Sequence, residues 1–281
     1  MKMIKNKNVR GIMDVAFFLI VFLLIQLFCM YIVNTAKWIA EGKGFIYVLA
    51  SLRWADFTLT GKVLVAISVL SSVLTLSLFV WRKWSPVSRV WLASHPWVTL
   101  AWVVMLTIGT ILPSEWLVEQ MQYTLPESTA KLFESIMKEP WGYLAIGILA
   151  PLAEEVVFRG AILRTLLGMF EQRWHWAAIV ISALLFGIVH GNEPQGIHAT
   201  LIGLLLGWMY YRTDSIFPGV VFHWVNNTVA YLLFNMMPQL GDGELIDLFH
   251  GDAKMMWLGM GFSLCILLPS LFQLSFRLKK G

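Results

Sequence analysis

A series of apolar runs constrains this chain more than any other feature of its sequence. We count about eight of them, each near the roughly 20 residues that an α-helix needs to cross a bilayer. Their approximate bounds are 12–36, 62–81, 97–113, 141–167, 176–191, 196–211, 215–236 and 255–276. Runs of this length, recurring along the whole chain, predict an all-α, polytopic transmembrane helical bundle.

The composition favours the same class. Only 14% of the 281 residues are charged, against roughly a quarter in a soluble domain. The net charge of +4 does not indicate a nucleic-acid partner, because the basic residues lie at the ends of the apolar runs, as in membrane proteins. The run at 12–36 is too long for the core of a signal peptide, and no small-residue cleavage site follows it. We therefore expect it to remain attached as the first transmembrane helix.

The basic residues also indicate the orientation of the helices. With the N-terminus inside, 13 of the 21 lysines and arginines fall in cytoplasmic segments and 7 in outer segments. Because cytoplasmic loops carry an excess of these residues, both termini are predicted to be cytoplasmic. The outer connector at 114–139 carries five glutamates. It is predicted to be a solvated connector or an amphipathic helix at the membrane surface.

Three charged residues interrupt the run at 141–167. Glu154, Glu155 and Arg159 lie within "PLAEEVVFRGAIL", residues 151–163, although a charge near the bilayer centre costs roughly 2.5–3.5 kcal/mol on insertion scales. Arg159 follows Glu155 by four residues, so the two share a helix face and can form an ion pair. Glu154 lies about 100° around the helix from Glu155, so this ion pair does not use it and its carboxylate can have another role. The alternative is that all three form a purely structural ion network.

Further polar residues lie in the next runs. His190 ends "FGIVH", and His223 and Asn227 are spaced i, i+4 in "HWVNN", so these two share one helix face, whereas Asn226 lies off it. Each is costly in lipid, and each would be satisfied by meeting the others and Glu154. His198, near the outer start of the run at 196–211, is a more distant candidate for the same site.

This set of side chains suits hydrolysis in two ways. A glutamate can deprotonate a water, a histidine can polarise that water, and a second histidine with an asparagine can donate hydrogen bonds to an oxyanion. Alternatively, Glu154, His190 and His223 are a possible zinc ligand set, with water in the fourth position. The HExxH signature of the commonest zinc proteases, a GxSxG serine site and a pair of intramembrane aspartates are all missing from the sequence. The cofactor therefore stays open between none and a divalent metal such as zinc.

The three motifs together resemble those of a known family. "EEVVFR" matches EExxxR, "FGIVH" matches FxxxH and "HWVNN" matches HxxxN, in that order and on successive late runs. This is the pattern of the CPBP intramembrane proteases, which include the type 2 CAAX prenyl proteases and the bacterial ABI proteins linked to bacteriocin processing and immunity. The resemblance covers about 140–236. It implies a catalytic helical core there, preceded by N-terminal transmembrane helices and an outer amphipathic loop (1–139) and followed by an outer loop and a final transmembrane helix (237–281).

The resemblance also implies roles for individual residues. Glu154 would activate the water with His190 as its partner, and His223 with Asn227 would form the oxyanion site. Glu155 and Arg159 would be the supporting pair, and the catalytic cavity would open toward the cytoplasm. Counted from the cytoplasmic ends of their helices, however, Glu154 and His223 come out roughly 10–14 Å deep and His190 nearer 20 Å.

The function that these features favour is an intramembrane endopeptidase, glutamate- or metal-dependent. Its partners would be a membrane protein or peptide substrate and the lipid bilayer, and its location a bacterial plasma membrane. Two other classes stay open. One is a non-proteolytic membrane adaptor or immunity protein of the same fold. The other is a proton- or ion-coupled transporter, since intramembrane carboxylates and histidines also serve proton relays.

Overall fold

The computed structural model describes residues 7–86, 90–122, 126–237 and 244–279, and these residues contain helices and no strand. The α-helices are α1 (Lys7–Ala40), α2 (Phe45–Trp54), α3 (Gly61–Trp81), α4 (Val90–Ala93), α5 (Trp97–Gln120), α6 (Glu127–Met137), α7 (Ala150–Glu155), α8 (Arg164–Met169), α9 (His175–Ile188), α10 (Glu193–Thr213), α11 (Phe217–Met236) and α12 (Ala253–Arg277). Two π-helical segments, η1 (Tyr143–Leu149) and η2 (Val156–Leu163), join α7 and α8 into one rod. Short 3₁₀ turns are η3 (Gln172–Trp174) and η5 (Leu245–Phe249). The predicted all-α polytopic class is confirmed.

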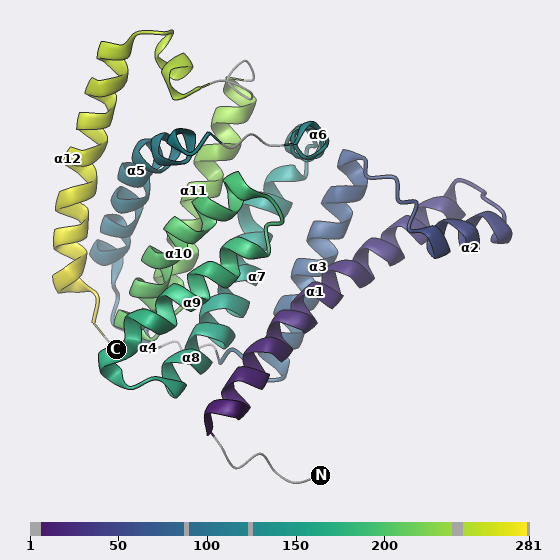
Figure 1. Ribbon diagram of the computed structural model, residues 1–281, viewed down its shortest axis with the longest axis horizontal. Helices are drawn as coiled ribbons and strands as arrows, with labels where there is room; N and C mark the ends of the chain where they lie inside the picture. The colour runs from purple at the N-terminus through teal and green to yellow at the C-terminus, as the bar shows by residue number, and fades with distance from the viewer. Residues whose placement is uncertain (1–6, 87–89, 123–125, 238–243, 280–281) are drawn as a thin grey trace.

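The helices form a central group covered on two flanks. The rod from η1 to α8 lies at the centre with α9, α10 and α11, while α1 and α3 cover one side and α5 and α12 the other (Figure 1). All eight residues of η2 are buried, and they lead into the main hydrophobic core. The segment that carries the charged residues is therefore enclosed by protein rather than by lipid.

Among the residues that the structure describes, only the covering helices look like membrane spans by length and apolarity alone. They are α1, α3, α5 and α12, and between 17% and 28% of their most apolar windows is buried inside the protein. Their remaining surface is left to face lipid, which requires apolar side chains. The four central runs are short or carry polar groups, and they tolerate this because other helices surround them.

Two predicted boundaries are wrong for local reasons. The run at 176–191 was predicted to include His190, but α9 ends at Ile188. Gly191 has a φ of +72°, and Asn192 caps α10 by accepting a hydrogen bond from the Gln195 backbone N–H at 3.1 Å, so the chain turns here. In addition, α5 continues through Pro113 to Gln120 and takes up the start of the outer connector, whose later part forms α6.

One end of the molecule gathers both ends of the described chain. The first turn of α1 and the last turn of α12 lie at this end, as an even number of crossings requires (Figure 1). Arg212, near the end of α10, donates from Nε to the Leu278 carbonyl at 3.1 Å and from Nη2 to the Ser275 carbonyl at 2.7 Å. The end of α12 is thereby fixed to the central helices. That this end faces the cytoplasm stays a prediction from the distribution of basic residues.

The contact between α5 and α12 depends on one glycine. A Cβ added at Gly109 would lie 2.6 Å from the Leu267 backbone nitrogen, whereas a Cβ at Gly261 would meet nothing within 4 Å. We expect Gly109→Ala to force the two helices apart and to lower the free energy of unfolding by about 1–3 kcal/mol. Gly261→Ala is the matched control and should leave stability unchanged or slightly raised. Thermal unfolding in detergent measures both, and equal effects would contradict the close α5–α12 contact.

Candidate active site

The two adjacent glutamates end a short α-helix between two π-helical segments. In η1 the Ala150 N–H donates to the Ala145 carbonyl, five residues earlier. In the same pattern, the N–H of residue 151 would donate to the Ile146 carbonyl, but residue 151 is a proline and has no N–H. Asn227 Nδ2 donates to the Ile146 carbonyl instead, at 3.0 Å. Because single π turns occur often at functional sites, this irregularity beside Glu154 marks a candidate site.

The predicted ion pair between Glu155 and Arg159 is present and fully enclosed. Arg159 Nη1 lies 2.8 Å from Glu155 Oε1, with side-chain exposures of 1% and 0%. Arg159 Nη2 also donates to the Gly203 carbonyl at 3.3 Å, and the guanidinium lies 4.4 Å from the centre of the Phe186 ring. Such additional contacts offset part of the cost of burying an ion pair, although Glu155 Oε2 and Arg159 Nε have no hydrogen-bond partner among the described residues.

A glycine makes room for the buried carboxylate. A Cβ at Gly219, in the first turn of α11, would lie 2.5 Å from Glu155 Oε2. The absence of a side chain there lets α11 approach the rod closely enough to bring His223, one turn later, against both glutamates. The sequence shows this glycine only as part of a Pro-Gly pair at the start of a helix, so its contact with Glu155 was not predicted.

His223 lies between the two carboxylates. Its Nδ1 is 3.4 Å from Glu155 Oε1, and its Nε2 is 3.6 Å from Glu154 Oε2. The imidazole and Glu155 are buried, while 22% of the Glu154 side chain is exposed. Of the two carboxylates, Glu154 is therefore the one that the protein does not fully enclose.

His190 joins the group through an aromatic ring. In the turn after α9, its Nδ1 donates to the Phe186 carbonyl at 2.8 Å, and its ring lies 5.0 Å from the Phe186 ring. The Phe186 ring in turn lies 5.7 Å from the ring of His223. Both histidines therefore contact one phenylalanine, despite the depths counted from the sequence. Within the described residues no hydrogen bond or ion pair links His190 to Glu154, and that pairing stays a prediction.

A further pair extends the polar group toward α5. His198 Nδ1 lies 3.5 Å from Glu115 Oε1, and His190, His223 and Asn226 are near enough to interact with the same imidazole. The sequence treats His198 as a distant candidate and does not single out Glu115. No signal could have selected Glu115 from the five glutamates of the outer connector, because its partner lies on a helix more than 80 residues later.

The three predicted metal ligands do not converge on a point. A zinc ion needs its ligand atoms about 2.0–2.2 Å away in a tetrahedral arrangement. No group of three histidine, cysteine, aspartate or glutamate side chains in the described part of the chain could hold an ion. His190 Nδ1 is bonded to a backbone carbonyl, and the two nitrogens of His223 face different carboxylates. Glu154, His190 and His223, as arranged, do not fit a zinc site.

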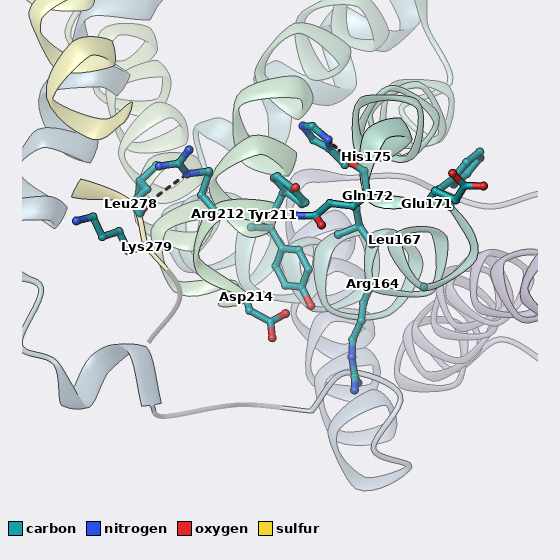
Figure 2. Close-up of a pocket in the computed structure, with 13 residues that line it drawn as sticks. Arg164, Leu167, Glu171, Gln172, His175, Tyr211, Arg212, Asp214, Leu278 and Lys279 are labelled. Carbon is teal, nitrogen blue, oxygen red and sulfur yellow. Dashed lines mark hydrogen bonds between the residues drawn. The ribbon is translucent and has the colours of Figure 1, made fainter. Parts of the chain in front are cut away.

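A cavity of about 750 Å³ lies elsewhere, at the end of the molecule where α12 ends. Its lining includes Arg164, Tyr211, Arg212, Asp214 and Lys279, and His175 lies at its edge with its ring stacked on Tyr211 at 4.1 Å between ring centres (Figure 2). None of the residues around Glu154 lines this cavity. It is therefore separate from the candidate active site.

Two comparisons with known proteins cover the segment that carries these residues. Residues 136–229 match the family model described as Type II CAAX prenyl endopeptidase Rce1-like. The match contains the EExxxR, FxxxH and HxxxN motifs. It confirms the resemblance to the CPBP and CAAX protease family and supports a membrane protease at the level of that family.

A protein of Bacillus subtilis (strain 168) named "Putative membrane peptidase YdiL" is similar to this chain, with 28% identity over 107 residues. The similarity covers 38% of this chain and 43% of the relative, so the chain spans less than half the length of the curated relative it matches. No solved structure matches the chain. Neither name mentions a metal or bacteriocin immunity.

The buried ion pair provides a test of the site's architecture. Arg159→Met would leave the Glu155 carboxylate buried without its cation, and we expect a loss of about 3–5 kcal/mol in the free energy of unfolding. Glu155→Gln combined with Arg159→Met removes both charges and should recover part of that loss. Thermal unfolding in lipid nanodiscs compares them. A double variant that is less stable than Arg159→Met would rule out the pairing.

Proposed function

We propose that this chain is an intramembrane endopeptidase that hydrolyses a peptide bond with a water activated by Glu154. The observation that carries the proposal is the grouping of Glu154, Glu155, Arg159 and His223 inside a helical membrane protein. Only one of the two adjacent carboxylates is neutralised by an arginine, and the other is partly exposed. A purely structural ion network would have no reason to keep the second carboxylate beside a histidine and partly exposed.

Glu154 is proposed as the general base. Glu155 accepts a hydrogen bond from Arg159 and lies 3.4 Å from His223 Nδ1. It is proposed to orient the imidazole electrostatically, with Nε2 toward Glu154. His223 and Asn227, one helical turn apart on α11, are the proposed donors to the oxyanion. His190, which contacts the same phenylalanine as His223, is proposed to polarise the attacking water.

The reaction then needs no covalent intermediate. Glu154 takes a proton from water while the water oxygen bonds to the scissile carbonyl carbon, and the carbonyl oxygen becomes an oxyanion. The C–N bond breaks as the oxyanion re-forms the carbonyl, and Glu154 returns its proton to the leaving amine. The products are a carboxyl group and an amine, and every proton is accounted for by the chain's own residues and the water.

The substrate is proposed to be a membrane-associated or membrane-embedded protein or peptide. A site enclosed by helices that themselves face lipid is reached most directly by a chain that already lies in the bilayer. The catalytic core is proposed to be residues 140–236, with 1–139 and 237–281 as flanking segments. The location proposed for the protein is a bacterial plasma membrane, in keeping with the Bacillus relative.

The test compares cells that carry the wild-type protein with cells that carry Glu154→Gln at matched abundance. Glutamine keeps the shape but cannot accept the proton, so we expect cleavage to fall at least about 100-fold. New protein termini in membrane and secreted fractions, mapped by mass spectrometry, measure the loss and identify substrates. Glu171→Gln, which changes an exposed carboxylate paired with Arg173, is the control and should leave the termini unchanged.

Identical termini in wild-type and Glu154→Gln cells would contradict the proposal. A phenotype that persists in Glu154→Gln cells would then point to the adaptor class, in which the polar group is only structural. Abundance must be measured in the same cells, because unpaired buried polar groups destabilise a protein.

A further inference from the structure

We propose that Glu115 and His198 form a positioning pair that acts on the catalytic site through Asn226 and Asn227. This inference rests on the proposed function and adds two residues to it. Glu115 lies outside residues 136–229, the segment matched by the family model. The pair would make α5, a covering helix, part of the catalytic apparatus.

The first link joins α5 to α10. Glu115 Oε1 lies 3.5 Å from His198 Nδ1. The glutamate side chain is 54% exposed, whereas the histidine side chain is 20% exposed. Within the described residues His198 Nδ1 has no hydrogen-bond partner. Nδ1 therefore faces the carboxylate of α5 through an electrostatic contact rather than a hydrogen bond.

The second link joins α10 to α11. The Asn226 side chain is near enough to the His198 ring to interact with it. Asn226 Nδ2 donates to Asn227 Oδ1 at 3.3 Å, and Asn227 Nδ2 donates to the Ile146 carbonyl at 3.0 Å. Polar groups of α5, α10 and α11 thus follow one another from the exposed edge of α5 to the π-helical segment beside the proline.

The consequence concerns which end of the Asn227 amide faces the substrate. An asparagine amide carries two N–H donors on nitrogen and only acceptors on oxygen. Because Asn227 Oδ1 is engaged by Asn226, and one N–H by Ile146, the second N–H is left to donate to an oxyanion. If Asn226 were released, the amide could rotate and present its oxygen, which would repel the developing negative charge.

His190 and His223 are near enough to His198 to interact with it electrostatically, so the ring borders the proposed site. Its neighbours are Glu115 from α5, His190 from the turn after α9, and Asn226 and His223 from α11. A role limited to fixing α5 against α10 would require only the contact with Glu115. The contacts on the other side of the ring are what a positioning role requires.

A double-mutant cycle tests this route. The assay uses the full-length protein in liposomes and a protein whose cleavage in cells depends on Glu154. Asn227→Ala is expected to lower kcat about 100-fold. His198→Leu should lower kcat about tenfold and change KM less than twofold, because a misplaced donor weakens the transition state more than substrate binding. If His198 acts through Asn227, the combined variant should be no slower than Asn227→Ala alone.

Three further variants complete the design. Asn226→Ala should lower kcat by the same factor as His198→Leu, and the variant that combines the two should have no lower kcat than His198→Leu alone. His198→Gln, which keeps a hydrogen-bonding group, should recover kcat to within about threefold of wild type. Thr200→Val is the matched control, because it removes a half-buried hydroxyl from the same part of α10 that bonds only the Gly196 carbonyl, and kcat should stay within about twofold.

The outcomes separate the inference from the function on which it rests. Multiplied losses in the combined variant, or an unchanged kcat in His198→Leu, would overturn the positioning role while leaving the protease intact. If Glu154→Gln retains full turnover in the same liposomes, the proposed mechanism itself fails. Should His198→Leu not fold, Glu115→Gln replaces it. This substitution at an exposed position should lower kcat about threefold. Combined with Asn227→Ala, it should lower kcat no further than Asn227→Ala does alone.

Discussion

The buried ion pair between Glu155 and Arg159 is the interaction on which the rest of the site depends. Neither charge could stay in the protein interior alone, so the pair is sustained by the Gly203 carbonyl, the Phe186 ring and the open space at Gly219. These contacts come from α9, α10 and α11. A single helix could not have satisfied the arginine, and the packing of the central helices is therefore arranged around it. The same carboxylate lies 3.4 Å from His223 Nδ1.

Much of the fold follows from the sequence, because apolar runs of bilayer length leave the chain few alternatives. Each of the eight predicted runs corresponds to a helix or to the rod formed by η1, α7, η2 and α8. The end of α9 could not be predicted from apolarity, since Val189 and His190 continue the pattern while Gly191 and Asn192 end the helix. The π-helical segments leave no trace in the hydrophobic pattern beyond Pro151.

Contacts of the candidate site could be predicted where both residues lie on one helix, but not where they lie on different helices. The spacing of Glu155 and Arg159 fixes their contact, so that pair could be predicted from four residues of separation. The position of His223 between two carboxylates depends on how α11 crosses the rod, which spacing does not encode. Counting depth along straight helices likewise placed His190 apart from the group, although a shared phenylalanine brings it beside His223. Glu115 lies beyond any local pattern.

The π-helical segment η1 determines the direction in which all later side chains of the rod point around its axis. A π turn contains about one residue more than an α turn, so it shifts the angular position of later side chains by about 100°. If one residue were removed from Tyr143–Leu149, the rod could close into a regular α-helix of nearly the same length. Its apolar composition would hardly change, yet Glu154 would point to a different neighbour. In this protein the direction of the proposed catalytic carboxylate is thus determined by the number of residues in a segment that contains no polar side chain except Tyr143.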